Sequence, residues 1–195
     1  MTDSIQVLSK RWEPAQLIAA KYKVIERVSR WSHNNQISLS CRDGEQEHSA
    51  FVLAHGDAIA PSRVDGVIVH QDSDFNGFLA AHNETYFRQI WDHLSEEFGA
   101  VFRMRLMKLE PKASLSFHED FFRRIHIPII TNDRSFFFMN EGNQIPWLTD
   151  DIRVPGIQTY HLPADGRMYL VDTTRHHTVY NGGKTDRVHL VCSIP

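Results

Sequence analysis

The second half of the chain consists of short strand-like segments, and this pattern constrains the fold more than any other feature. After Gly99, segments rich in β-branched and aromatic residues follow one another, most of them separated by turn signals such as Pro163-Ala164-Asp165-Gly166. Short strands at this spacing are typical of a sandwich or barrel, whereas the strands of a parallel α/β sheet alternate with helices. The segments span residues 101–109, 123–131, 135–140, 157–162, 168–173, 177–181 and 187–194.

The first half of the chain predicts two helices and two weaker strands. Pro14 suits the first turn of a helix, and apolar residues at helical spacing continue that helix over about 14–30. A second apolar stripe predicts another helix, which Gly99 would end. Two short apolar runs within 36–54 are typical of strands. The apolar stripes are Ile18, Tyr22, Ile25 and Val28 in the first helix, and Phe87, Ile90, Trp91, Leu94 and Phe98 in the second.

These segments together predict a mainly β (α+β) fold in which two N-terminal helices pack on a double-sheet jelly roll. A chain of 195 residues suits one domain with a sizeable core. We therefore expect a single domain over residues 1–195. Residues 101–195 would form the jelly-roll core, and residues 1–100 would form a helical and mixed part that supports it.

Composition excludes several classes of protein. Hydrophobic residues make up 42% and charged residues 23%, as in ordinary globular domains and unlike a disordered chain. A net charge of -3 gives no basic surface for nucleic acid, and no apolar run is long enough to span a membrane. The first residues lack the pattern of a secretion signal, and the two cysteines, Cys41 and Cys192, match neither a disulfide framework nor a zinc knuckle. We expect a cytoplasmic protein.

The chain holds 12 histidines, which raises the possibility of a metal site. A His-x-Asp motif on or beside a strand can direct an imidazole and a carboxylate to one metal ion, and a distant second histidine completes a facial triad with open positions on Fe(II). Chance alone gives roughly one such motif in a chain of this composition. Three are present, namely His55-Gly56-Asp57, His70-Gln71-Asp72 and His118-Glu119-Asp120.

The position of His118 distinguishes it from the other two histidines. It directly precedes the strand-rich half, where His177 and Arg187 follow. The pair Asn181-Gly182 is a hairpin signal, so we expect the strand from His177 to fold back beside the strand that contains Arg187. A metal ion on His177 and the guanidinium of Arg187 would then hold the two ends of one small dicarboxylate.

At these residues the sequence resembles a known family. The pattern RLMKLEP…HED…RIHIP…GRMYLVDTTRHHTVYNGGKTDRVHLV, over about 103–194, is similar to the aspartyl/asparaginyl β-hydroxylase family of Fe(II)/2-oxoglutarate oxygenases, which includes bacterial proline hydroxylases. The resemblance implies a cupin-like double-stranded β-helix. It implies the metal ligands His118, Asp120 and His177, the 2-oxoglutarate-binding Arg187, and further cosubstrate contacts from Arg124 and His126. Asp120 resembles the bacterial branch, because the vertebrate enzyme has glycine at this position.

The resemblance also implies an activity. An enzyme of this kind uses Fe(II), 2-oxoglutarate and O2 to hydroxylate an aliphatic carbon of an amino acid or of a residue in a peptide, and it releases succinate and carbon dioxide. Because a cytoplasmic protein would not meet disulfide-bearing secreted domains, we expect a free amino acid, a related small acid or a short peptide as substrate. Residues 1–100 would contribute to its binding.

Several residues have alternative roles. His118 and Asp120 could form a capped turn with a solvated acid, and His176 competes with His177 as a ligand. His126 could be a buried histidine bonded to backbone. Arg187 could form an ordinary surface ion pair. Arg103 and Arg105 share one strand face. They could line the cavity and bind the substrate's carboxylate, but we expect them to point into solvent.

Two other functions remain open at this point. A jelly roll with a three-residue metal site could be a cupin-type metal enzyme that does not use 2-oxoglutarate. It could also be a non-catalytic sensor that binds metal and 2-oxoglutarate without turnover.

Overall fold

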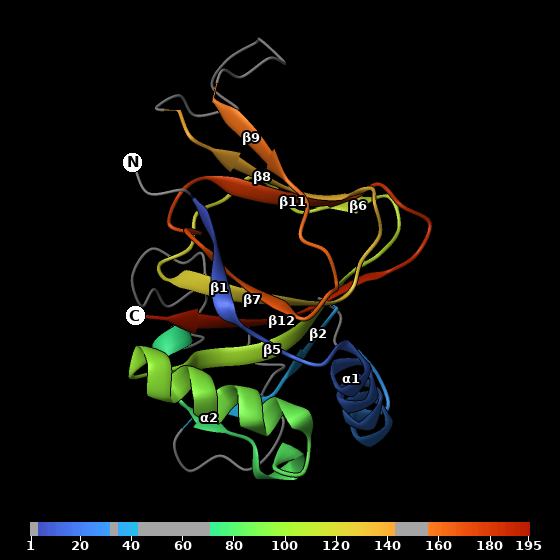
Figure 1. Ribbon diagram of the computed structural model, residues 1–195, viewed down its shortest axis with the longest axis vertical. Helices are drawn as coiled ribbons and strands as arrows, with labels where there is room; N and C mark the ends of the chain where they lie inside the picture. Colours follow the sequence, from blue (N-terminus) through green and yellow to red (C-terminus); the bar gives the residue numbers. More distant parts are fainter. Residues whose placement is uncertain (1–3, 32–34, 43–70, 143–155) are drawn as a thin grey trace, which may run out of the picture.

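The computed structural model describes residues 4–31, 35–42, 71–142 and 156–195, and these residues form two stacked antiparallel sheets with two helices below them (Figure 1). This arrangement confirms the predicted jelly roll. The six-stranded major sheet has the order β1 (Ile5–Arg11), β10 (Arg167–Val171), β7 (Arg123–Ile130), β12 (Arg187–Ile194), β5 (Phe102–Leu109) and β2 (Gln36–Ser38). The four-stranded minor sheet has the order β6 (Ala113–Ser114), β11 (His177–Asn181), β8 (Ser135–Asn140) and β9 (Ile157–Tyr160).

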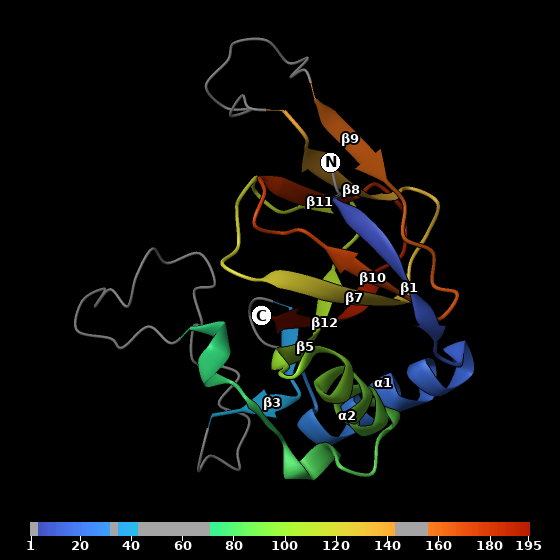
Figure 2. The ribbon, with the colours of Figure 1, turned by 60° about the vertical axis from the view of Figure 1, so that its left-hand side comes forward.

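Helices cover the face of the major sheet that lies away from the minor sheet (Figure 2). Helix α2 (Tyr86–Phe98) buries the predicted stripe from Phe87 to Leu94, and it ends at Gly99, whose φ of 77° is left-handed. Short elements lead into it: η2 (Asp72–Asp74), η3 (Ala80–His82) and a small ladder of β3 (Ser40–Cys41) with β4 (Gly77–Phe78). Within the described residues, no helix is long and apolar enough to cross a membrane.

Helix α1 (Pro14–Val28) forms where it was predicted, but a different face is buried. Leu17, Ala20 and Val24 pack into the core, whereas Tyr22 is 60% exposed. Both stripes have helical spacing, so periodicity could not choose between them. The small side chain of Ala20 lies on the buried stripe, which suits close packing of the helix against the sheet.

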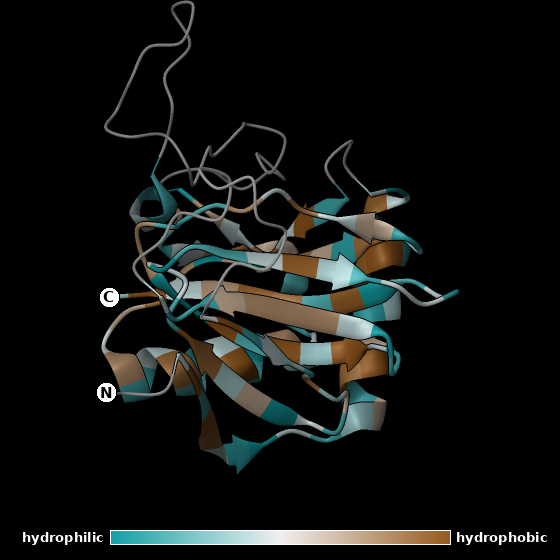
Figure 3. Ribbon diagram, turned by 90° about the horizontal axis from the view of Figure 1, so that it is seen from above, coloured by the Kyte–Doolittle hydropathy of each residue, from teal (hydrophilic) through white to brown (hydrophobic). Residues whose placement is uncertain are grey.

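The major sheet has two chemically different faces. Alternate residues such as Ile125, Ile127 and Leu190 join the core beneath the helices. The residues between them, among them Arg124 and His126, point toward the minor sheet, and Figure 3 shows hydrophilic and hydrophobic residues within the same strands. Because side chains alternate along a strand, a polar inner face accompanies the apolar outer one. The space between the sheets therefore holds charged side chains.

Three strands were not predicted. β1 is an edge strand whose residues are mostly exposed, so it lacks a strong alternation of apolar residues, while β4 and β6 are only two residues long. β1 and β2 come from the N-terminal part of the chain and extend both edges of the major sheet. The strand predicted near residues 49–54 lies outside the described residues.

The predicted hairpin after His177 is wrong. β11 belongs to the minor sheet and β12 to the major sheet, so the chain crosses between sheets at residues 181–186. An Asn-Gly hairpin turn requires positive φ angles, which neither Asn181 nor Gly182 has. Instead, the buried Asn181 amide donates to the carbonyl oxygens of Leu109, Glu110 and Thr185 and so stabilises the crossover.

A tight contact holds β1 against β10, and it provides a test of the fold. Gly166 has a φ of 85°, and a Cβ atom there would lie 1.9 Å from the carbonyl oxygen of Trp12. We expect Gly166→Ala to lower the free energy of unfolding by at least about 2 kcal/mol, measured by urea denaturation. Gly99→Ala is the matched control, because its φ is also positive but no atom lies within 4 Å of the added carbon. Its cost should be only about 1 kcal/mol, and equal losses in both variants would contradict this account.

Candidate metal centre

Three of the predicted residues converge at one end of the inner face. His118 forms an antiparallel bridge with His177, the first residue of β11, through backbone hydrogen bonds of 2.8 and 3.0 Å. This bridge brings the two imidazole rings to 4.4 Å between centroids. With Asp120, each residue offers a ligand atom, and these atoms all lie within 4.8 Å of one another.

Hydrogen bonds fix which nitrogen of each ring is available. Nδ1 of His118 lies 2.8 Å from the carbonyl oxygen of Ser116, and Nδ1 of His177 lies 2.9 Å from that of Arg175. A carbonyl can only accept, so both Nδ1 atoms donate, and each neutral ring keeps a lone pair on Nε2. Those Nε2 atoms lie 4.0 and 3.5 Å from the Asp120 carboxylate. When both rings are neutral, three acceptors meet here without a proton between them, an arrangement that fits a bound cation.

His177 is neutral at physiological pH. Its burial, and next the neighbouring His118, lower its pKa to about 3, although its hydrogen bond to Arg175 acts in the opposite direction. A metal ligand must be deprotonated, and this ring already is. His176 does not compete, because its Nδ1 lies against the Glu119 carboxylate instead.

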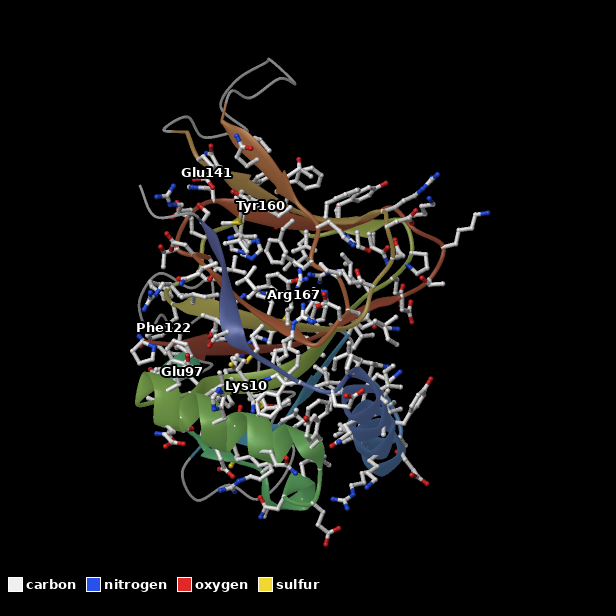
Figure 4. All side chains as sticks on the ribbon, in the orientation of Figure 1. Lys10, Glu97, Phe122, Glu141, Tyr160 and Arg167 are labelled. Carbon is white, nitrogen blue, oxygen red and sulfur yellow. The ribbon has the colours of Figure 1, made fainter. Side chains whose placement is uncertain are left out.

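The chain segment that carries these ligands is anchored on both sides. The Asp120 amide donates to Thr173 at 2.8 Å, and Arg175 forms ion pairs with Asp172 and with Glu141, which also accepts from Tyr160. Figure 4 shows Glu141 and Tyr160 at the minor sheet. This network holds the Arg175 carbonyl in the position from which it orients His177.

Arg124 contacts the candidate ligand Asp120 directly. Its Nη1 lies 2.7 Å from Oδ2 of Asp120, and its Nη2 lies 3.6 Å from Asp72. Asp72 in turn binds Arg103 at 2.6 Å and accepts from Ser193 at 2.6 Å. A buried charge cluster of Asp72, Arg103, Arg105, Arg124 and Asp120 therefore adjoins the three ligands.

This cluster corrects the expectation that Arg103 and Arg105 are solvated, because Arg105 is buried and the Arg103 side chain is only 12% exposed. Asp72 was visible in the sequence only as part of a second His-x-Asp motif, and no local signal predicted its arginine partners. Burial alone would raise the pKa of Asp72, but Arg105, Arg103 and Arg124 together lower it below the usual range. His55, Asp57 and His70 lie outside the described residues.

Arg187 lies at the other end of the polar face. It is buried, and its Nη2 donates to Nδ1 of His189 at 3.0 Å. No carboxylate within the described part of the chain forms an ion pair with it, so the surface alternative is wrong. Burial lowers the pKa of Arg187 to about 9. The guanidinium packs on Phe137, with 5.5 Å between its carbon and the ring centroid.

His126 lies between these two ends. It is buried, and neither ring nitrogen has a hydrogen-bond partner within the described residues, so it is not the backbone-bonded histidine considered as an alternative. Burial, followed by Arg187 and Arg124, lowers the pKa of His126 well below its usual value. A neutral ring with two unused nitrogens is available to a ligand in the space between the sheets.

Fold and site together define a jelly-roll protein with a candidate metal centre, and several solved structures share this fold. An oxidoreductase of the 2OG-Fe(II) oxygenase family from Burkholderia pseudomallei matches with a TM-score of 0.57 and 12% identity, covering 97% of this chain and 83% of that one. AviO1 from Streptomyces viridochromogenes Tue57 matches with a TM-score of 0.52 and 11% identity, covering 98% of this chain and 90% of that one. The nickel complex of the non-heme monooxygenase ThoJ matches with a TM-score of 0.51 and 14% identity, covering 98% of this chain and 73% of that one. At these identities the likeness shows a shared fold.

The family follows from the sequence itself. The model of the Aspartyl/Asparaginyl beta-hydroxylase family matches residues 75–195, more than half of the chain, and the protein belongs to this family. A comparison with curated proteins finds no match. Asp72, β1 and β2 precede the matched region, although they contribute to the charge cluster and to the major sheet.

The ion pairs of Asp72 predict a pH dependence of stability. Since the folded-state pKa of Asp72 is lowered, its contribution is complete above the unfolded value of about 4 and is lost as the pH falls. Asp72→Asn should lower the free energy of unfolding by about 3 kcal/mol at pH 7, and the difference from the wild type should narrow between about pH 5 and pH 2. Urea denaturation across this range measures both effects.

Asp92→Asn is the control, because Asp92 forms an exposed pair with Arg88 on α2. Its cost should stay below about 1 kcal/mol at every pH. If Asp72→Asn behaved like this control, the buried cluster would not have the structural importance inferred here.

Proposed function

We propose that this protein is an Fe(II)- and 2-oxoglutarate-dependent oxygenase that hydroxylates an aliphatic carbon of a free amino acid, a related small acid or a short peptide. The observation that carries the proposal is the polar inner face. It has three converging ligand atoms at one end and, at the other, a buried arginine without a carboxylate partner among the described residues. Membership of the family supports the same conclusion.

His118, Asp120 and His177 would hold the metal. Two neutral imidazoles and one carboxylate suit Fe(II) and leave positions for other ligands. When bound, iron with 2-oxoglutarate and O2 supplies hydroxylation coupled to formation of succinate and carbon dioxide. The protein's share is to keep both rings in one tautomer and to orient the Asp120 carboxylate through Arg124.

Arg187 would bind the distal carboxylate of 2-oxoglutarate. Its planar guanidinium suits bidentate contact with a carboxylate, and His189 and Phe137 already hold it in place. A dianion entering this space would meet the positive charge of Arg187 and of the metal, both in surroundings from which water is largely excluded. We assign further contacts with the cosubstrate to Arg124 and to the unbonded nitrogens of His126.

Apolar side chains enclose the reacting region. Phe137 stacks on His177 with 6.0 Å between ring centroids, and Met139 and Val179 join it in a second buried cluster between the sheets. Such surroundings strengthen charge interactions and limit side reactions with water. The proposal places the protein in the cytoplasm, where small acids and peptides are available as substrates.

An assay of 2-oxoglutarate turnover tests the proposed activity. With Fe(II), ascorbate and 2-oxoglutarate, the wild type should form succinate even without a primary substrate, through slow uncoupled turnover. Asp120→Ala and His177→Ala should each reduce the rate at least about a hundredfold, because the metal loses a ligand. Activity on a small acid without 2-oxoglutarate would favour a cupin-type enzyme, and binding of 2-oxoglutarate without any turnover would favour a sensor.

A substitution at Arg187 tests the cosubstrate site separately. In the absence of oxygen, Arg187→Ala should weaken 2-oxoglutarate binding to the Mn(II)-loaded protein at least about thirtyfold, because a buried charge pair is lost. Titration calorimetry should show little change in Mn(II) affinity. Arg123→Ala is the control, since Arg123 lies on β7 with its side chain exposed. Unchanged 2-oxoglutarate affinity in Arg187→Ala would refute this assignment.

A further inference from the structure

Arg105 lies on the inner face of the major sheet beside the candidate metal centre. In the register of the sheet, Arg105 is opposite Val191 of β12, and Val191 is opposite His126 of β7. Residues directly opposite one another in an antiparallel sheet point to the same face. Arg105 therefore shares the face of His126 and faces the space between the two sheets.

The Arg105 side chain is buried but only partly satisfied. The residue is 4% exposed, and its Nε and Nη1 atoms have no hydrogen-bond partner within the described part of the chain. Burial, followed by Arg103 and Arg124, lowers the pKa of Arg105 well below its ordinary value. A buried guanidinium whose Nε and Nη1 form no hydrogen bond is costly, so its position favours a ligand that compensates it.

The charges around Arg105 do not balance. Among the described residues, the cluster contains three guanidinium groups, those of Arg103, Arg105 and Arg124, and two carboxylates, those of Asp72 and Asp120. Asp72 binds Arg103 and Ser193, while Asp120 contacts Arg124 and is a candidate metal ligand. One positive charge remains, and a bound metal ion would add to it. The cluster therefore attracts an additional anion.

Arg105 and Arg187 lie at different ends of the site. Arg187 of β12 is opposite Leu109 of β5, and Leu109 follows Arg105 by four residues on that strand. At the rise of an antiparallel strand, these positions are about 13 Å apart. In the proposed function, Arg187 binds the distal carboxylate of 2-oxoglutarate. Arg105 is therefore available to bind a different anionic group near Asp120.

We propose that Arg105 binds the carboxylate of the primary substrate, and that the substrate is a small molecule with a free carboxylate. The inference rests on the proposed function, since it concerns the same site. A guanidinium is well suited to a carboxylate because both are planar and complementary in charge. For an amino-acid substrate, the free α-carboxylate distinguishes the molecule from the same residue inside a protein chain. Arg105 thus determines specificity and is distinct from the metal ligands.

Calorimetric titration tests this inference without turnover. Protein loaded with Mn(II) and 2-oxoglutarate is titrated with each free L-amino acid and with its α-carboxamide, which has the same side chain but no negative charge. We expect at least one amino acid to bind and its amide to bind at least about tenfold more weakly. Arg105→Met should weaken binding of that amino acid by at least about the same factor and leave Mn(II) and 2-oxoglutarate affinities unchanged, while Arg105→Lys should retain part of it.

A second readout separates ligand binding from a structural role. Without ligands, Arg105→Met should lose much less thermal stability than Asp72→Asn, because Arg105 forms no hydrogen-bonded ion pair among the described residues and methionine keeps an apolar side chain of similar length. Arg123→Met, an exposed position on β7, is the control for loss of an arginine and should change neither affinity nor stability.

Several outcomes would overturn the inference. These are no amino acid binding by the loaded wild type, equal binding of the amide, unchanged affinity in Arg105→Met, or a loss of thermal stability in that variant as large as the loss in Asp72→Asn. If 2-oxoglutarate still binds in these cases, only the role of Arg105 fails. If the Mn(II)-loaded wild type does not bind 2-oxoglutarate, the proposed function fails first and the inference fails with it.

Discussion

The backbone bridge between His118 and His177 is the interaction on which the site depends. It joins the segment that precedes β7 to the first residue of β11, so two distant parts of the sequence supply one pair of imidazoles. The carbonyl oxygens of Ser116 and Arg175 then fix the tautomer of each ring. Asp120 follows His118 by two residues, and Arg124 holds its carboxylate beside both rings. Backbone pairing thus brings the two imidazoles together, and further contacts orient both rings and the Asp120 carboxylate.

Around this bridge, the protein buries more charge than it neutralises. Arg187 at one end and Arg105 at the other form no hydrogen bond with a carboxylate among the described residues, and burial lowers the pKa of both. Buried, unpaired cations reduce stability, so a fold that retains them depends on its apolar face for compensation. That face is the large core between the major sheet and helices α1 and α2. The separation of an apolar outer face from a polar inner face allows the structure to tolerate these buried cations.

Sequence patterns predicted the parts of this structure that local chemistry determines. The stripe from Phe87 to Leu94 and the stop at Gly99 define α2, and the strands of the second half form where they were expected. The patterns failed where partners are remote. Asn181 has a local hairpin signal, yet long-range hydrogen bonds make it a crossover. Arg105 was expected in solvent, because alternation does not reveal that the second face of a sheet is enclosed by another sheet.

In the proposed function, one enclosed polar face receives a metal ion and a dicarboxylate together. A crystal structure of the protein, grown without oxygen in the presence of Fe(II) and 2-oxoglutarate, tests it most directly. The account predicts iron bound by Nε2 of His118, Nε2 of His177 and the carboxylate of Asp120, with the distal carboxylate of 2-oxoglutarate on Arg187. Iron bound by other residues, or 2-oxoglutarate held away from Arg187, would contradict it.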